Sequence, residues 1–148
     1  MRFLEPSEVN DLNQVATLGQ EFAVRMEHQY VFLPEEFCRL WKAFLDTKMG
    51  FILVSTIAGE IREAIGGMTF SDPHDGVKCG MVGFWYYGDG PRGLQSGRLF
   101  QSFERKMVEL EVRRLFAQAL LNSRFPAVSH FLGGVGFRPV EMNFVKDI

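Results

Sequence analysis

The stretch that decides the fold is VKCGMVGFWYYGDGPRGLQSGRLF, residues 77–100. Its first part, residues 77–87, is rich in valine and aromatic side chains, which predicts a strand. A strict alternation places apolar side chains on both faces: Met81, Trp85 and Tyr87 on one, and Val82, Phe84 and Tyr86 on the other. A strand that is apolar on both faces predicts a central place in a sheet covered by helices on both sides.

A glycine-rich loop follows this strand and enters a helix. Residues 88–93 are GDGPRG, and the helix after them shows the apolar stripe Leu99, Phe103, Met107 and Leu110. Backbone N–H groups at the start of a helix and the positive end of its dipole favour anions. The loop therefore predicts an anion site, with a plain turn as the alternative interpretation. It is not a Walker loop, because no Gly-Lys-Ser/Thr follows, and the pattern G-x-G-x-x-G is absent.

The rest of the chain predicts helices and strands on either side of this unit. Pro34 with two following glutamates marks the start of one helix, and Ser7 is the expected N-cap of an earlier one. The expected order is a strand in 2–6, helices in 7–26 and 34–48, a hairpin in 50–70, the strand and helix above, a strand in 113–121, a helix in 125–137 and a closing strand in 138–148. We therefore expect an α/β fold with a central mixed sheet, since the unit 77–121 implies a parallel pair and the meander before it implies antiparallel strands.

Length and composition set the class of protein. A chain of 148 residues suits one domain over 1–148, and a net charge of −2 argues against a nucleic-acid binder that relies on bulk electrostatics. The beginning of the sequence does not resemble a signal peptide, and no apolar run is long enough to span a bilayer, so we expect a cytoplasmic protein without a membrane partner. Cys38 and Cys79 are expected to be reduced thiols. A second copy is a candidate partner, because an exposed edge strand can pair with another edge.

The loop and the order of the elements resemble the GNAT superfamily of N-acetyltransferases over nearly the whole chain. In that family a loop of the form Arg/Gln-x-x-Gly-x-Gly/Ala opens a helix and wraps the pyrophosphate of acyl-coenzyme A. The matching residues here are RGLQSGR, 92–98, with Gln95 in the place of the middle glycine. Asn122, after the next strand, and GGVGF, 133–137, match two further family positions.

This resemblance implies acetyl-coenzyme A as co-substrate, with no metal, and a primary amine on a small molecule or a protein as acceptor. The amine would attack the thioester directly, in a cleft where a backbone N–H near Tyr86 polarises the carbonyl. His28 and Tyr30 fall in the region that lines the acceptor side of the family. The implied cofactor contacts are Tyr87, Arg92, Gly93, Gln95, Ser96, Gly97, Arg98 and Asn122.

The acid and base of such a transfer stay open. The family often has a tyrosine that protonates the departing thiolate, where this chain has Leu132, so Tyr86 or Tyr87 could substitute, or solvent could. The candidates for the base are Asp89, Glu63, Glu27 and His28. Asp89 can equally cap its turn, and Glu63 is expected to be a solvated strand residue.

Two hypotheses follow. The first is an acyl-coenzyme A dependent N-acyltransferase that transfers its acyl group to a primary amine. The second is a non-catalytic coenzyme-binding or structural module with the same fold, which Gln95 and Leu132 favour because both replace residues that the family uses. A metal site is not expected, because His28, His74 and His130 are scattered along the chain.

Overall fold

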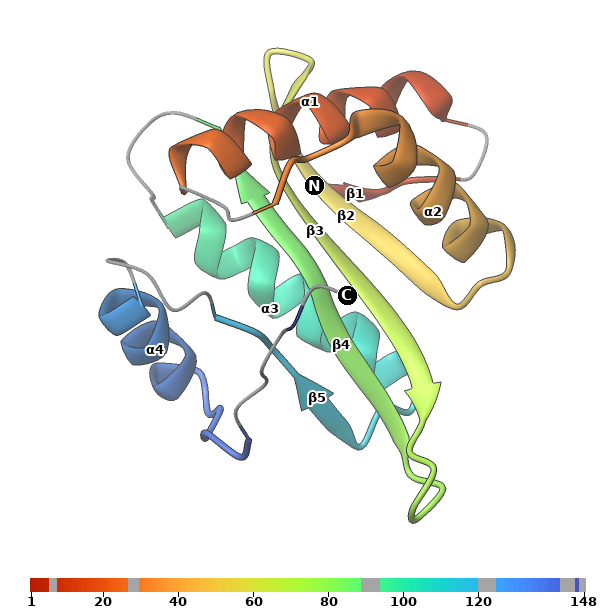
Figure 1. Ribbon diagram of the computed structural model, residues 1–148, viewed down its shortest axis with the longest axis vertical. Coiled ribbons are helices and arrows are strands. Elements are labelled where there is room, and N and C mark those ends of the chain that lie inside the picture. The colour runs from red at the N-terminus through yellow and green to blue at the C-terminus, as the bar shows by residue number, and fades with distance from the viewer. Residues whose placement is uncertain (6–7, 27–29, 89–93, 120–124, 142–145, 147–148) are drawn as a thin grey trace. The chain divides into compact units, whose positions relative to one another are not determined.

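A computed structural model describes residues 1–148 with the exception of 6–7, 27–29, 89–93, 120–124, 142–145 and 147–148, and only the backbone of 94–96 (Figure 1). The chain divides into two compact units, Met1–Phe116 and Ala117–Ile148. A single domain over the whole length stays a prediction.

The first unit contains a five-stranded mixed sheet in the order β1-β2-β3-β4-β5. Its strands are β1 Arg2–Phe3, β2 Gly50–Ile57, β3 Glu60–Ser71, β4 Lys78–Tyr87 and β5 Arg114–Phe116. Neighbouring strands are antiparallel from β1 to β4, whereas β4 and β5 are parallel. The predicted mixed sheet with an antiparallel meander and one parallel pair is therefore confirmed.

The predicted hairpin is confirmed, and a turn of two residues joins β2 to β3. Ala58 and Gly59 lie between the strands and both have positive φ, 51° and 85°. Two consecutive residues of positive φ are typical of the turns whose twist matches that of the flanking strands. The hairpin brings β3 into the sheet beside β4.

Helices cover both faces of the sheet (Figure 1). On one face lie α1, Val9–Arg25, and α2, Pro34–Asp46, and on the other lies α3, Leu94–Glu109. The core under α1 and α2 includes Val15, Trp41, Ile52 and Ala64, and aromatic rings dominate its edge. The core under α3 is built from its buried stripe Leu99, Phe100, Phe103 and Met107. Leu110 follows the end of α3 instead of extending its stripe.

A bulge in β4 overturns the strict alternation expected for that strand. The register shifts between Gly66 and Gly67 on β3, which pair with Phe84 and Val82, so that Gly83 is the extra residue. A Cβ at Gly80 would meet Met107 of α3, whereas one at Gly83 would meet Trp41 of α2. Phe84 also packs on Trp41, with ring centroids 4.7 Å apart. Because the bulge inverts the alternation, Val82 does not share a face with Phe84 and Tyr86.

Other expectations are wrong in detail. The N-cap of α1 is Glu8 instead of Ser7, and Leu40, expected in the apolar stripe of α2, is exposed. The strand expected over 113–121 is only three residues long, Arg114–Phe116. The closing strand expected over 138–148 is absent from its described residues 138–141 and 146.

The second unit contains α4, Phe125–Gly134, among its described residues. This helix ends at Gly134, three residues before the end of the range expected for it. Gly136 has a φ of 95°, and Phe137 N–H donates to the carbonyl of Leu132 at 2.9 Å. A left-handed glycine of this kind satisfies the last carbonyls of a helix without strain.

Candidate functional site

The sequence places the candidate site at the end of β4 and the start of α3, and part of it is described. Tyr86 and Tyr87 end β4, Gly97 and Arg98 lie in the first turns of α3, and Tyr30 precedes α2. The side chains of Gln95 and Ser96 lie outside the described atoms, although both residues belong to α3. The candidates outside the described residues altogether are Glu27, His28, Asp89, Arg92, Gly93 and Asn122.

The parallel pairing of β4 with β5 is short, and β4 continues beyond it. Among the described residues, the pairing of β4 with β5 covers Cys79, Gly80 and Met81. β4 continues beside β3 to Tyr87, and Gly88 N–H extends this ladder by donating to the carbonyl of Arg62 at 2.9 Å. The bulge at Gly83 lies where the two parallel strands stop pairing. Figure 1 shows β4 running well past β5 toward the loop that leads to α3.

Tyr86 lies in an aromatic cluster between β4 and the helices α1 and α2. Its ring stacks on Phe84 with centroids 4.6 Å apart and contacts Phe22, Phe32 and Phe37 at 5.3–6.0 Å. Burial raises the pKa of Tyr86 to about 12, so its phenol is protonated at neutral pH. The tyrosine can therefore donate a hydrogen bond, but it is a weak proton donor toward a thiolate, which has a lower pKa than this phenol.

Gly19 of α1 leaves the space that the aromatic rings of this cluster occupy. A Cβ at Gly19 would lie 2.6 Å from Cε2 of Tyr86 and 2.8 Å from Cζ of Phe32. Only a residue without a side chain allows the helix to approach the rings this closely. The glycine was not singled out from the sequence, since an isolated helical glycine carries no signal of what it packs against.

The end of α1 contacts the end of β4 directly. The guanidinium of Arg25 donates to the carbonyl of Tyr87 and lies over the Tyr87 ring, 5.3 Å from its centroid. Phe22 packs edge-on against the same ring at 5.2 Å. These contacts connect the last turn of α1, which leads toward Tyr30, to the final residue of β4. Sequence reasoning missed Arg25, which looks like an ordinary basic residue at a helix C-terminus.

Two described residues in the first turns of α3 are accessible to solvent. Gly97 and Arg98 are exposed, and a Cβ added at Gly97 would meet no other atom within 4 Å. An approaching anion would therefore find the backbone at Gly97 uncovered by described atoms, with the cationic side chain of Arg98 beside it. This arrangement fits a phosphate group.

One acidic side chain of β3 is buried where the sequence predicts a solvated one. Glu63, expected to be solvated, is only 6% exposed, and its Oε1 accepts a hydrogen bond from Nε1 of Trp85 at 2.9 Å. It lies opposite Tyr87 in the β3–β4 ladder. Alternation along β3 could not find this burial, because the residues flanking Glu63 in sequence, Arg62 and Ala64, gave no indication that a helix covers its face.

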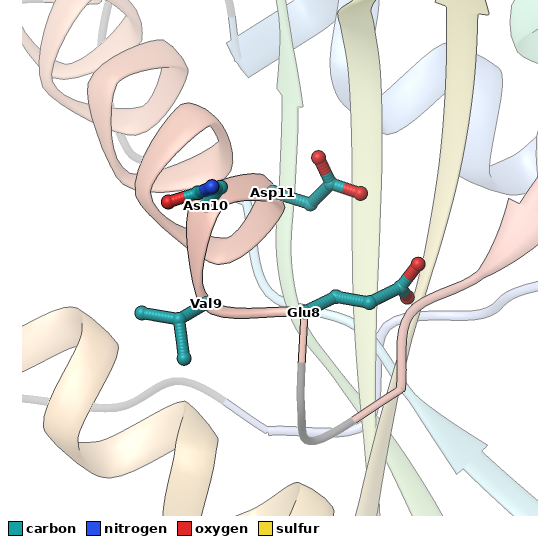
Figure 2. A pocket seen from close by; sticks show the side chains of 4 residues that line it. All are labelled: Glu8, Val9, Asn10 and Asp11. Atoms are coloured by element: carbon teal, nitrogen blue, oxygen red, sulfur yellow. The ribbon is translucent and has the colours of Figure 1, made fainter.

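A pocket elsewhere in this unit is lined by Glu8, Val9, Asn10 and Asp11 (Figure 2). Figure 2 shows the carboxylates of Glu8 and Asp11 on one side of the chain and Val9 directed away from them. Both carboxylates form ion pairs with Arg2, which fastens β1 to the start of α1. This pocket lies at the opposite end of α1 from the contact of Arg25 with Tyr87, so we assign it a structural role.

Within the described part of the chain, no group of three or more His, Cys, Asp and Glu side chains is placed to hold a metal ion. None of the described helices is both long and apolar enough to cross a membrane.

Several solved structures with the same fold are named as acetyltransferases. A predicted acetyltransferase from Clostridium acetobutylicum, solved with acetyl-CoA, is 10% identical with a TM-score of 0.79, and the alignment covers 99% of this chain and 95% of that one. A GNAT family acetyltransferase from Staphylococcus aureus is 14% identical with a TM-score of 0.72, over 99% and 96% of the two chains. An aminoglycoside acetyltransferase from an uncultured soil metagenomic sample, in complex with sisomicin, is 11% identical with a TM-score of 0.77, over 99% and 94%.

No protein-family model matches the sequence, and no curated protein matches it. The chain has the fold of the GNAT acetyltransferases, as its sequence predicts. At these identities the likeness concerns the fold, and the chemistry has to be argued from the site.

Proposed function

We propose that this protein is an acyl-coenzyme A dependent N-acyltransferase that transfers an acyl group, most simply acetyl, to a primary amine. The observation that carries the proposal is that β5 pairs only with Cys79–Met81, so that β4 runs on to Tyr87 past the end of β5 and leads to a helix whose first turns expose Gly97 and Arg98. An extended ligand is proposed to lie along β4 beyond the end of β5. The following helix start offers N–H groups and Arg98 to its phosphates.

Acyl-coenzyme A fits the two ends of this site. Its pyrophosphate would contact the backbone around Gly97 and the guanidinium of Arg98, with Arg92, Gly93, Gln95 and Ser96 as the further contacts implied by the loop. The pantetheine arm would run along β4 toward Tyr87, and Asn122 is proposed to contact it. The solved acetyltransferase with acetyl-CoA supports this choice of co-substrate.

The chemistry we propose is direct transfer. The acceptor ammonium loses a proton to a base, and its nitrogen attacks the thioester carbonyl carbon. The carbon–sulfur bond then breaks, the nitrogen gives up its second proton, and the departing thiolate takes up one proton, so that one proton per transfer remains with the base. A backbone N–H near Tyr86 would stabilise the oxyanion, and holding both reactants together supplies the proximity. Asp89 is the proposed base, and Tyr86 the proposed hydrogen-bond donor on the thiolate side.

The acceptor is proposed to be an amine on a small molecule or a protein, bound near His28 and Tyr30. Tyr30 is half-exposed and lies close in sequence to Phe32, which packs on Tyr86. This places the segment before α2 beside the end of β4. The aminoglycoside acetyltransferase solved with sisomicin supports a small polyamine as one member of the test panel.

Thiol release from acetyl-coenzyme A, measured over a panel of primary amines, tests the proposal. Arg98→Glu is the test variant, and Arg105→Glu is its matched control, because Arg105 is an exposed arginine further along α3. We expect turnover with at least one amine, loss of about tenfold or more in Arg98→Glu, and little change in Arg105→Glu. Equal losses in both variants would show that the effect is one of net charge and not of a phosphate site.

A second candidate is a module that binds coenzyme A without turnover. Two features support it: Gln95 in place of a family glycine, and the raised pKa of Tyr86, which makes this tyrosine a weak acid. Saturable binding of acetyl-coenzyme A with no thiol release for any amine would favour this second function. Turnover that Arg98→Glu abolishes would eliminate it.

A further inference from the structure

A buried carboxylate occupies the α3 face of the sheet, and the chemistry above does not use it. Among the described residues, the buried polar or charged side chains are Ser55 and Glu63, each 6% exposed. Glu63 pairs with Ser55 of β2 on one side and with Tyr87 of β4 on the other. It lies on the same face as Gly67, where a Cβ would contact Phe103 and Met107 of α3.

Glu63 is linked to α3 through one side chain. Its Oε1 accepts the indole N–H of Trp85 at 2.9 Å. The Trp85 ring stacks on Phe100, with centroids 5.5 Å apart and planes 18° apart, and Phe100 stacks on Phe103. Phe100 is only 2% exposed and lies early in α3. A continuous contact path therefore runs from β3 through β4 to the first turns of α3.

A buried carboxylate at this position lowers the stability of the protein if its only role is to accept one hydrogen bond from a neutral donor. Buried charged groups are normally paired with an opposite charge. Among the described residues no lysine or arginine forms an ion pair with Glu63, and the neighbouring Arg62 pairs with Glu60 instead. Conversely, a charged acceptor gives the indole N–H a stronger and more directional bond than an amide would. A stronger bond fixes the plane of the indole, and the indole plane fixes the stack on Phe100.

We propose that Glu63 is a positioning residue that locks Trp85 and thereby fixes the start of α3 against the C-terminal half of β4. These are the two elements between which acyl-coenzyme A is proposed to lie, so this inference rests on the proposed function. Glu63 acts through Trp85 and does not contact the reacting atoms. Without Glu63, the start of α3, which is proposed to bind the phosphates, is held less firmly against β4, along which the acyl end is proposed to lie.

The test compares variants that keep or remove the acceptor atom. Glu63→Gln keeps an amide oxygen for the indole N–H, whereas Glu63→Leu removes it at similar volume. Trp85→Phe deletes the donor while keeping an aromatic ring against Phe100. Ser55→Ala is the matched control, because it changes the other buried polar residue on this face. Each variant is titrated with acetyl-coenzyme A by calorimetry and assayed for turnover across pH.

We expect Glu63→Leu and Trp85→Phe each to weaken acetyl-coenzyme A binding about tenfold, and the double variant to add little to either. Glu63→Gln should lie between wild type and Glu63→Leu in binding, because its amide oxygen still accepts the indole N–H but more weakly than a carboxylate does, and its pH profile of kcat should be unshifted. Ser55→Ala should bind as wild type. Amide exchange should be faster in the first turns of α3 in Glu63→Leu, which reports positioning without any need for activity.

Three outcomes overturn the inference. Wild-type binding in both Glu63→Leu and Trp85→Phe would mean that the hydrogen bond between Glu63 and Trp85 does not affect acetyl-coenzyme A binding. Strictly additive losses would mean that the two residues act independently. A collapse of kcat in Glu63→Gln with unchanged binding would make Glu63 the base itself. If wild type and Ser55→Ala give no binding signal, the proposed function fails as a whole. If Glu63→Leu does not fold, Trp85→Phe and Glu63→Gln still decide the question.

Discussion

Replacing Gly19 by alanine should destabilise the protein, although the same change normally stabilises a helix. Alanine is favoured over glycine in a helix interior by about 1 kcal/mol. At Gly19, however, the new methyl would lie 2.6 Å from Tyr86 and 2.8 Å from Phe32, where ordinary contact begins at 3.4 Å. The Tyr86 ring must therefore move by about 0.8 Å. Overpacking of this kind costs about 1–3 kcal/mol, so the net effect should be a loss of about 1 kcal/mol.

Gly97→Ala is the matched control for the intrinsic preference of a helix for alanine over glycine. It also lies in a helix, but a Cβ there meets nothing within 4 Å, so this variant should gain up to about 1 kcal/mol in the absence of ligand. Urea unfolding of both variants, at unchanged m-value, measures the difference between them, expected at about 2 kcal/mol. If Gly19→Ala were as stable as Gly97→Ala, the close packing of α1 on Tyr86 would be wrong.

Three further predictions concern stability. Burial raises the pKa of Tyr86 to about 12 from an ordinary 10, so wild type should lose about 2 kcal/mol relative to Tyr86→Phe as pH rises from 10 to 12, measured by urea unfolding at each pH. If the difference in unfolding free energy between wild type and Tyr86→Phe did not change with pH, the burial of the Tyr86 phenol would be wrong. Arg114 lowers the pKa of Asp75 below 3.8, so the stability advantage of wild type over Arg114→Gln should be present at neutral pH and disappear as pH falls through the folded-state pKa of Asp75. An advantage that persists in acid would mean that the ion pair is not its source. Phe103→Ala should cost about 3–5 kcal/mol in chemical unfolding, because Phe103 is fully buried under α3. A cost below about 1 kcal/mol would place α3 loosely on the sheet.

Local signals in the sequence were enough to predict most elements of the first unit. Pro34 followed by two glutamates marks the start of α2 where the structure has it, and the turn at Ala58 and Gly59 closes the predicted hairpin. Both signals act over a few residues, so no knowledge of distant contacts is needed. The apolar run 77–87 similarly predicted a strand inside the sheet, and β4 pairs with β3 and β5, although of its large side chains only Phe84 is buried.

The errors arise where distant contacts decide. The bulge at Gly83 exists because β4 must pair with β3 while Trp41 of α2 fills the space that a side chain would occupy there, and no alternation rule contains that information. The burial of Glu63 depends on Trp85 and on α3 above it. The strand expected over 113–121 ends at Phe116, although the sequence beyond it stays apolar, because pairing with β4 stops there.

The location of the candidate site stays a prediction, and its contacts could not be predicted from the sequence. The loop pattern pointed to the junction of β4 and α3, and Gly97 and Arg98 are indeed exposed at the start of that helix. The role of Arg25 at the carbonyl of Tyr87 could not be predicted, because the two residues meet only when α1 packs on the sheet. The roles of individual residues in catalysis stay predictions.

Calorimetric titration of the wild-type protein with acetyl-coenzyme A tests the central claim most directly. The account predicts saturable binding of one molecule per chain, weakened about tenfold or more in Arg98→Glu and unchanged in Arg105→Glu. The absence of any binding heat up to millimolar acetyl-coenzyme A, in a protein that unfolds cooperatively, would contradict it.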